Sequence, residues 1–239
     1  HGVKWIPAWG EDRMTSMIQE RSDWCISRQR TWGVPIPIFF CKKCKKPLIN
    51  DDTISAVAAL FREKGTSAWF DTDAADILPA GTKCECGCSE FTKETDTMDV
   101  WFDSGSSHAA VLEERDELAY PADLYLEGND QYRGWFQSSM LTSIATKGVS
   151  PYKTVITHGM IVDEERQKMS KSKGNGMSPQ EITQQYGADI LRLWVSSSDY
   201  RADMKISKKM FKQLSQNYLK IRNTARYIMG NLNGFTLDQ

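Results

Sequence analysis

The sequence predicts an α/β fold that contains a parallel sheet and a small cysteine-rich insertion. Two short apolar segments, at 123–126 and 154–157, lie on either side of a helical pattern that ends near Gly148. Strand, helix and strand at this spacing are typical of a parallel βαβ unit. Five of the 6 cysteines lie in two tight groups between residues 41 and 97, which indicates that this segment forms its own small core.

The first elements follow from local patterns. Met14, Met17 and Ile18 fall on one face of a predicted helix near the start of the chain. In the segment 27–40, Pro35 and Pro37 exclude a helix and favour an extended edge segment. A helix is predicted next, and it runs from Thr53 to Lys64.

The βαβ unit supplies the central elements. After the strand 123–126 the chain should turn at 127–130, and the second strand should close at His158-Gly159. The helix between them should end at Gly148, a common stop signal. Its inward residues are predicted to be Trp135, Phe136, Met140 and Ile144.

The last third of the chain is predicted to be helical. Ser178 to Glu181 form a capping box with proline at the first helical position, and this helix should end near Gly187. A second helix carries Ile190, Leu191 and Trp194, and Ser207 should cap a long final helix. That helix has an apolar stripe with no later segment to cover it, which leads us to expect a piece of a longer protein. The stripe comprises Phe211, Leu214, Tyr218, Ile221, Ala225 and Ile228.

Composition narrows the function classes. The chain has 239 residues, a net charge of -1 and 40% hydrophobic residues, enough to bury a core. It has no apolar run of the roughly 20 residues that span a bilayer and no signal-peptide pattern. The near-neutral charge argues against nucleic-acid binding through a broad basic surface, so any such contact has to be local.

The cysteine groups predict a structural zinc site. Cys41 and Cys44 form a normal knuckle, and the second group, Cys84-x-Cys86-x-Cys88, offers three thiols for two places. We favour Cys84 and Cys86, because a glycine after the ligand lets backbone amides turn toward the sulfur; Cys88 is the alternative. Four thiolates leave no open position on zinc, which argues for a structural role. Reduced cysteines without metal are the other interpretation.

Polar residues at the two strand ends form a candidate ligand site. In an open parallel sheet, ligands bind beyond the carboxyl ends of the strands. Glu127, Gly128, Asp130 and Gln131 follow the first strand there, and Trp135 could form the wall of an apolar pocket. The simpler interpretation is an acidic helix N-terminus in which Asp130 complements the helix dipole.

The motif KMSKSKGN, residues 168–175, is the third candidate. Lys168, Lys171 and Lys173 could gather around a polyphosphate, and Gly174 and Gly176 would let the loop open and close. An isolated lysine run is usually a solvated basic turn. The neighbouring strand-end residues favour the phosphate interpretation here.

Longer stretches of the chain resemble class I aminoacyl-tRNA synthetases. They are WCISRQRTWGVPIPIF, TKETDTMDVWFDSGSSH, DLYLEGNDQYRGWFQSSML, THGMIVDEERQKMSKSKGN and SPQEITQQYGADILRLWVSSSDYRADMKIS. The lysine motif is the family's KMSKS signature, and the similarity is greatest to the branch that activates isoleucine. The resemblance implies the C-terminal half of a Rossmann-like nucleotide-binding fold. The HIGH signature, the first half of that fold and the editing domain are absent, so we expect an internal fragment.

The resemblance also implies a set of site residues. Glu127 would hold the ammonium group of the aminoacyl-adenylate, and Trp101 and Trp135 would shape a pocket for a branched aliphatic side chain. Lys168 and Lys171 would be the catalytic lysines that stabilise the leaving pyrophosphate, with Lys171 the main ATP contact. The remaining ATP and adenylate contacts would be Gly128, Asp130, Gln131, His158, Gly159 and Met160.

The implied activity is an ATP-dependent ligase reaction. Isoleucine would attack ATP with Mg²⁺ present, and the activated amino acid would pass to tRNA(Ile). The family implies a cytoplasmic enzyme, monomeric when complete, with no membrane partner. The expected domains are a connective segment (1–40), the zinc-knuckle insertion (41–97), the second half of the catalytic domain (98–162), the KMSKS loop with stem-contact helices (163–206) and the start of an anticodon-binding bundle (207–239).

Three other interpretations stay open. A valine- or leucine-activating relative would carry different residues around WFDSG and LEGNDQYRGWF. A generic phosphate-binding α/β enzyme lacks support, because the chain has no glycine-rich P-loop. A zinc-knuckle RNA-binding module without catalysis would use the basic residues of the last segment, although these are spread around a helix. They are Lys205, Lys208, Lys209, Lys212, Lys220, Arg222 and Arg226.

Overall fold

The computed structural model describes residues 2–169 and 176–236, and these residues divide into two compact units. Lys171 and Lys173 therefore lie outside the described residues. Unit 1 comprises His1–Val3, Glu11–Asp123 and Gln131–Lys153; unit 2 comprises Lys4–Gly10, Leu124–Asp130 and Thr154–Gln239.

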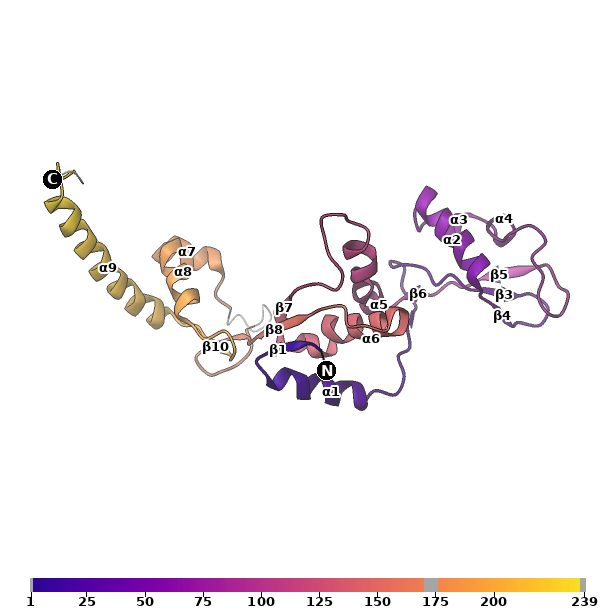
Figure 1. Ribbon diagram of the computed structural model, residues 1–239, viewed down its shortest axis with the longest axis horizontal. Coiled ribbons are helices and arrows are strands. Elements are labelled where there is room, and N and C mark those ends of the chain that lie inside the picture. The colour runs from indigo at the N-terminus through magenta and orange to yellow at the C-terminus, as the bar shows by residue number, and fades with distance from the viewer. Residues whose placement is uncertain (1, 170–175, 237–239) are drawn as a thin grey trace. The chain divides into compact units, whose positions relative to one another are not determined.

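Unit 2 contains a three-stranded parallel sheet. Its order is β1-β8-β7, with β1 at Lys4–Ile6, β8 at Thr154–His158 and β7 at Tyr125–Gly128 (Figure 1). The predicted parallel pair is confirmed, but β7 begins and ends two residues later than expected. Glu127 and Gly128 are therefore strand residues and not a turn, because they pair in register with Thr157 and His158 of β8. β1 was not predicted from the sequence.

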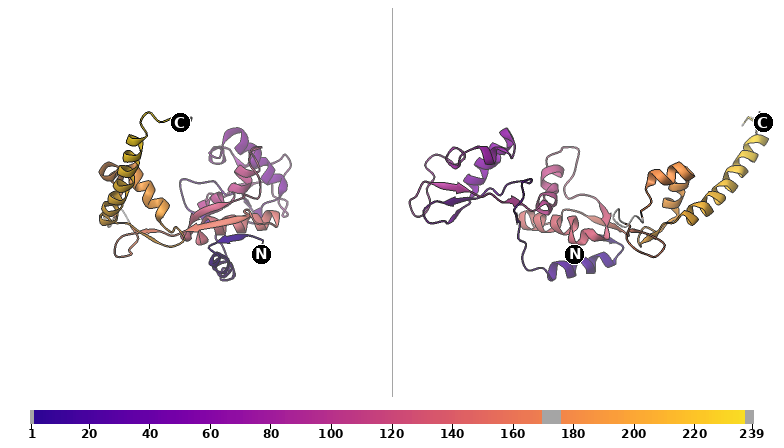
Figure 2. Two further views of the ribbon diagram at one scale, coloured as in Figure 1. Left: turned by 60° about the vertical axis from the view of Figure 1, so that its left-hand side comes forward. Right: turned by 180° about the vertical axis from the view of Figure 1, so that it is seen from behind.

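The rest of unit 2 is mainly helical. Two-stranded parallel pairing joins β9 (Ile161–Val162) to β10 (Met204–Lys205). The helices are α7 (Pro179–Tyr186), α8 (Ala188–Ser197) and α9 (Lys208–Asn231), and α7 and α8 lie side by side near the start of α9 (Figure 2). Their shared core consists of Ile182, Ile190, Trp194, Ile206 and Phe211.

The helix caps in unit 2 follow the sequence prediction. Ser178 and Glu181 form the reciprocal capping box, and the side chain of Ser207 accepts a hydrogen bond from the Met210 amide. The apolar stripe of α9 is only partly covered: Phe211 is fully buried, whereas Ile221 and Ile228 are exposed. In the described part of the chain no helix, α9 included, combines the length and the apolar character that crossing a bilayer requires.

Unit 1 brings α5 (Val100–Gly105) against α6 (Trp135–Lys147). The Gly148 stop is confirmed, since this residue ends α6 in the left-handed conformation. Ile144 was predicted to face inward, but it is 47% exposed. Apart from Phe136, the buried residues of α6 are polar or small: Gln137, Ser138, Ser139, Thr142 and Ser143.

The small hydroxyl face of α6 has a packing reason. A Cβ atom at Gly105 would lie 2.8 Å from the carbonyl carbon of Ser138, so the two helices approach at backbone distance. Thr142 Oγ1 donates a 2.7 Å hydrogen bond to the Gly105 carbonyl. Bulky side chains at these positions would separate α5 from α6.

The remaining part of unit 1 is the cysteine-rich insertion. Its antiparallel sheet has the order β4-β3-β5, formed by Pro47–Leu48, Phe39–Cys41 and Phe91–Lys93. The sheet packs with α2 (Asp51–Lys64), α3 (Ala68–Asp71) and α4 (Ala74–Ile77) around a core of Phe39, Cys41, Val57, Trp69, Ile77, Leu78 and Phe91. The predicted helix from Thr53 starts two residues earlier, because Asn50 caps it together with Thr53.

A short ladder anchors the insertion to the rest of unit 1. In it β2 (Ser27–Arg28) pairs antiparallel with β6 (Thr97–Met98). Pro35 forms an isolated bridge to Thr97, which agrees with the extended segment predicted for 27–40.

Candidate functional site

Four of the predicted ligand residues meet at the carboxyl ends of β7 and β8 in unit 2. Gly128 is buried and lies opposite His158 in the ladder. A Cβ atom on it would lie 2.8 Å from Asp130 Oδ1, 2.9 Å from Met160 Cε and 3.4 Å from His158 Cε1. A side chain at this point would force the Asp130 and Met160 side chains to shift, because both lie close to the Gly128 backbone.

Glu127 stands beside this group with an exposed side chain. Its strand neighbour is Thr157 of β8, which is buried. Within residues 2–169 and 176–236, the structure gives Glu127 no ion-pair partner. An exposed carboxylate at the edge of a parallel sheet is free to bind an incoming cationic group.

Gly159 is one of the ATP contacts that the resemblance implies, and in the structure it packs closely against a distant segment. A Cβ atom here would overlap the backbone of Ala202. The Gly159 amide donates to the Tyr200 carbonyl at 2.8 Å, and the Met160 amide donates to Asp203 Oδ1 at 2.8 Å. The segment 200–203 therefore occupies one side of the His158–Met160 backbone.

Lys168 is the one catalytic lysine candidate that the structure describes. It is exposed, and its backbone forms an antiparallel bridge with Val162 at the end of β9. The turn between them is held by Asp163, whose Oδ1 accepts from the amides of Glu165 and Gln167.

In unit 1, the two predicted pocket tryptophans lie on α5 and α6. The indole N–H of Trp135 donates to the Ser104 carbonyl at 3.0 Å and to Ser107 Oγ at 3.3 Å, so α6 is hydrogen-bonded to α5 through this side chain. Trp101 is 42% exposed, and its ring lies against Gly134, where a Cβ atom would be 3.0 Å from Trp101 Cη2. Gln131 Oε1 accepts from the Trp135 amide at 2.8 Å, so this predicted adenylate residue also caps α6.

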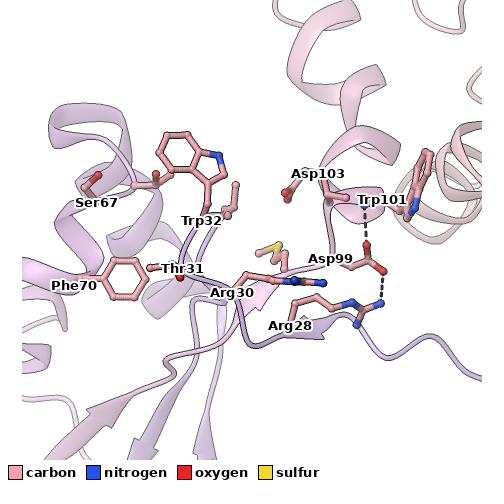
Figure 3. A pocket seen from close by; sticks show the side chains of 14 residues that line it. Arg28, Arg30, Thr31, Trp32, Ser67, Phe70, Asp99, Trp101 and Asp103 are labelled. Atoms are coloured by element: carbon pink, nitrogen blue, oxygen red, sulfur yellow. Dashed lines mark hydrogen bonds and ion pairs between the residues drawn. The ribbon is translucent and has the colours of Figure 1, made fainter. Parts of the chain in front are cut away.

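The sequence analysis missed two charged residues near Trp101. Asp99, which is buried, forms an ion pair with Arg28 at 2.5 Å and accepts a hydrogen bond from the Trp101 amide at 3.0 Å (Figure 3). The position of Asp99 directly before a helix is a cap signal that could have been noticed. Nothing local predicts its pairing with Arg28, 71 residues earlier.

Two cavities adjoin the Arg28–Asp99 ion pair. The larger, about 890 Å³, is also lined by Arg30, Trp32 and Phe70 (Figure 3). The smaller, about 200 Å³, is also lined by Arg21, Trp24, Trp101, Arg133, Gly134, Gln137 and Ser138. Trp101 borders both.

The four favoured cysteines come together in the insertion. The sulfurs of Cys41, Cys44, Cys84 and Cys86 all lie within 4.8 Å of one another. Cys41 is 3.6 Å from Cys86 and Cys44 is 3.4 Å from Cys84, sulfur to sulfur. A tetrahedral zinc with bonds of about 2.3 Å needs sulfurs about 3.8 Å apart, so the geometry fits this ion. The sulfur of Cys88 instead accepts from the Glu90 amide at 3.4 Å.

The loop that carries Cys84 and Cys86 has the glycine-dependent turn that we predicted after the second ligand. Gly87 has φ of 79° and donates its amide to the Cys84 carbonyl at 2.8 Å. Such a turn lets the backbone fold around a sulfur ligand.

Two thiols of this cluster, Cys41 and Cys84, have shifted pKa values. Hydrogen bonds from the backbone amides of Cys44 and Lys43 lower the pKa of Cys41 to about 6. The pKa of Cys84 is raised to about 12: the Cys86 amide favours its thiolate, but the Cys44 thiol and burial outweigh that. Of these two thiols, Cys41 is the one whose thiolate its surroundings favour.

The family model for class I tRNA synthetases (I, L, M and V) matches residues 1–207. The chain therefore belongs to this family of class I tRNA synthetases, as its parallel sheet and motifs predicted.

Curated relatives are more specific. The chain is 64% identical over 237 residues to an isoleucine–tRNA ligase of Caldanaerobacter subterraneus subsp. tengcongensis, which covers 99% of this chain and 25% of that protein. It is 63% identical over 234 residues to the isoleucine–tRNA ligase of Caldicellulosiruptor saccharolyticus, covering 98% of this chain and 25% of the relative. The chain thus spans about a quarter of the length of the curated relatives it matches.

Two solved structures share the fold at low sequence identity. One is a LeuRS of Agrobacterium radiobacter K84 in a ternary complex with tRNA and LeuAMS, with a TM-score of 0.60, 22% identity, and coverage of 95% of this chain and 31% of the other. The second is methionyl-tRNA synthetase of Mycobacterium tuberculosis bound by methionyl-adenylate, with a TM-score of 0.54, 19% identity, and coverage of 88% and 32%.

Proposed function

We propose that this chain is part of an isoleucine–tRNA ligase, which converts L-isoleucine and ATP to isoleucyl-adenylate and pyrophosphate and then transfers the isoleucyl group to tRNA(Ile) with release of AMP. The observation that carries the proposal is the 64% identity to an isoleucine–tRNA ligase over 99% of the chain. Membership of the family alone does not decide whether the substrate is isoleucine, leucine, methionine or valine. The relatives favour isoleucine among these four.

The strand-end residues of unit 2 are proposed to hold the nucleotide part of the adenylate. Gly128 and Asp130 would contact the adenylate and its ribose, and the backbone of His158–Met160 would contact adenine. The convergence of Asp130, His158 and Met160 on Gly128 supports this role, because groups that are already held together lose little freedom when a ligand binds. Glu127, exposed and without an ion pair among the described residues, would bind the ammonium group of isoleucine.

The residues of unit 1 are proposed to recognise the aliphatic side chain. Trp101 and Trp135 supply apolar surface, and Gln131, which caps α6 beside them, would contact the adenylate. One methylene separates isoleucine from valine and provides only about 1–3 kcal/mol of discrimination. A pocket of this kind has to be held rigidly to achieve that difference.

The chemistry that follows is charge stabilisation and positioning. The isoleucine carboxylate attacks the α-phosphorus of ATP, the bond to the bridging oxygen of the β-phosphate breaks, and pyrophosphate leaves; Mg²⁺ would supply positive charge for the phosphates of ATP. Lys168 and Lys171 are proposed to stabilise the negative charge that develops on the leaving group. No covalent bond to the protein is needed for this step.

We further propose that Cys41, Cys44, Cys84 and Cys86 hold a structural zinc ion. The sulfur separations support four thiolate ligands, and such a set leaves no coordination position for a substrate. Zinc would then stabilise the insertion and take no part in the reaction.

Binding of a nonhydrolysable isoleucyl-adenylate, measured by calorimetry on this chain, tests the ligand site. We expect measurable binding that weakens at least tenfold in Glu127→Ala and in Lys171→Ala, since each removes a charge that this proposal assigns to ligand binding. The matched control is Glu164→Ala, an exposed carboxylate in the 163–167 turn, which should bind like the unchanged chain.

The same measurement separates the alternatives. A zinc-knuckle RNA-binding module would not bind the adenylate in any variant, and that result would overturn the proposal. Tighter binding of the valyl or leucyl analogue would keep the family and refute isoleucine as the substrate.

A further inference from the structure

Asp99 uses both oxygens of its carboxylate to join two distant segments of unit 1. Oδ1 accepts from the backbone amide of Trp101 at 3.0 Å, so Asp99 is the N-cap of α5. Oδ2 accepts from Trp24 Nε1 at 3.1 Å and from Arg28 Nη2 at 2.5 Å. With all these partners and a buried side chain, Asp99 has one well-defined position.

The donors that face Asp99 are themselves fixed. Arg28 Nη1 donates to the carbonyls of Cys25 and Ser27 at 2.6 and 2.8 Å, which holds the guanidinium in place. The Trp24 ring contacts Phe102 of α5 at a centroid distance of 5.9 Å. The Asp99 amide donates to the Ile26 carbonyl at 2.6 Å, which continues the β2–β6 ladder. The segment 24–28 thus supports the first turn of α5, and Figure 3 shows the Arg28–Asp99 ion pair that forms part of this support.

The position of the Trp101 ring depends on this support more than the position of the Trp135 ring does. Within the described part of the chain its indole nitrogen makes no hydrogen bond, whereas the indole of Trp135 makes two. The ring of Trp101 is located by contact with Gly134 and by the backbone from which it extends. That backbone is the first turn of α5, and the Asp99 carboxylate holds its amide.

We propose that Asp99 is a positioning residue that sets amino-acid specificity by fixing Trp101 through the first turn of α5. This inference rests on the proposed function, because it takes Trp101 to be a wall of the isoleucine pocket. Discrimination by one methylene depends on small distances, so a shift of this wall weakens selection of isoleucine over valine before it affects the nucleotide.

The test is the steady-state kinetics of amino-acid activation by the complete ligase proposed above. Asp99→Asn keeps the size of the side chain, but it removes the charge and places an N–H group against the N–H donors of Arg28 and Trp24. We expect the KM for isoleucine to rise roughly tenfold and the preference for isoleucine over valine to fall severalfold. The KM for ATP should stay unchanged.

Two further variants complete the design. Trp24→Phe removes one donor to Asp99 and keeps a ring against Phe102, so it should shift the same parameters in the same direction by a smaller factor. Because it is a mild change, it keeps the inference testable if Asp99→Asn does not fold. The matched control is Asp96→Asn: Asp96 bonds to exposed Gln29 at 2.7 Å and not to α5, so its kinetics should be unchanged.

Trp101→Ala separates failure of the inference from failure of the proposed function. If Trp101→Ala raises the KM for isoleucine while Asp99→Asn and Trp24→Phe do not, the pocket stands and the positioning role is refuted. If Trp101→Ala is also without effect, the assignment of the pocket itself is wrong. A parallel loss of kcat for both amino acids in Asp99→Asn, with an unchanged preference, would show a purely structural role and refute the inference.

Discussion

At the scale of single residues, two glycines are constrained by close packing at positions where we also propose ligand contacts. Gly128 is the last residue of β7 and Gly159 follows β8, and a Cβ atom at either position would lie within 3.0 Å of a neighbouring atom. At Gly128 the neighbours are side chains, whereas at Gly159 they are the backbone atoms of Ala202 and Asp203. A methyl group at 159 therefore meets atoms that cannot rotate away.

Gly159→Ala should destabilise the chain by about 2 kcal/mol or more, because it forces segment 200–203 away from the strand end. Urea unfolding measures the loss. Gly176→Ala is the matched control, since a Cβ atom there contacts nothing within 4 Å and the change should stay within about 0.5 kcal/mol. Equal stability of both variants would contradict the close approach at Gly159.

The pH dependence of stability should depend on Asp99. Burial alone would raise the pKa of Asp99, but hydrogen bonds from the Trp101 amide and Trp24, with the charges of Arg28 and Arg21, outweigh it and the pKa is lowered. The nearby Asp103 is a carboxyl whose pKa is raised, first by burial and then by Asp99. A lowered pKa in the folded state means that stability from Asp99 is present above the ordinary carboxyl pKa and is lost as the pH falls through the lowered value.

We therefore expect the unfolding free energies of the unchanged chain and of Asp99→Asn to differ most near pH 7. The difference should shrink as the pH falls below about 4, where carboxyl groups take up protons. Denaturant unfolding at a series of pH values checks this. A difference that stays constant down to strongly acidic pH would show that the charge of Asp99 contributes nothing.

At the scale of elements, α6 shows how a helix can be buried through hydroxyl groups. Ser143 Oγ donates to the Val149 carbonyl at 2.7 Å and also contacts Tyr120 Oη at 2.6 Å. Ser139, one turn earlier and equally buried, has no partner for its Oγ among the described residues. The two serines have the same size and burial and differ in whether the hydroxyl is satisfied.

Replacing each serine with alanine should therefore give opposite results. Ser139→Ala should be neutral or stabilising by up to about 1 kcal/mol, because it removes an unsatisfied buried hydroxyl. Ser143→Ala should destabilise by about 1–3 kcal/mol, because it leaves Tyr120 and the Val149 carbonyl without a partner. Thermal and urea unfolding measure both; a larger loss for Ser139→Ala than for Ser143→Ala would refute this account of α6.

The proposed zinc site in the cysteine-rich insertion can be tested by metal analysis and thermal unfolding. Metal analysis should find one zinc per chain, and Cys86→Ser should lose it, whereas Cys88→Ser should keep it because Cys88 contacts Glu90 instead. Removing zinc with a chelator should lower the melting temperature, since metal binding stabilises the folded loop. Zinc loss in Cys88→Ser with retention in Cys86→Ser would reverse the ligand assignment.

At the scale of the whole molecule, the sequence predicted the elements and helix ends that depend on residues close together in the chain. The β7–α6–β8 order, the caps at Ser178 and Ser207 and the stop at Gly148 all follow from short patterns, and the structure confirms them. Strands of two or three residues, such as β1 and β2, carry no pattern of their own and form only through distant pairing.

The residues of the candidate site also differ in whether local sequence patterns could predict them. Glycines and carboxylates at strand ends are visible in the sequence, because chain order and strand type place them at one edge of the sheet. The Arg28–Asp99 pair joins segments 71 residues apart, and the buried face of α6 is polar, so hydrophobic patterns identify neither. Lys168 lies beside Val162 through a backbone bridge across the short turn that Asp163 holds, a local pairing that we did not predict.

The chain by itself is expected not to catalyse isoleucine-dependent exchange between ATP and pyrophosphate. The resemblance places half of the phosphate-binding machinery with the HIGH signature, which the 239 residues do not contain. Radiolabelled pyrophosphate exchange measures this, with the complete ligase as the positive control. Robust exchange by the chain would show that the described residues and the KMSKS loop are sufficient.

Cys41 belongs both to the apolar core of the insertion and to the sulfur cluster. An engineer who wanted this insertion without a metal could not simply exchange four thiols for surface-compatible residues. The replacement at position 41 would also have to fill the space between Phe39, Val57 and Phe91 as a hydrophobic side chain, so the two design problems have to be solved together.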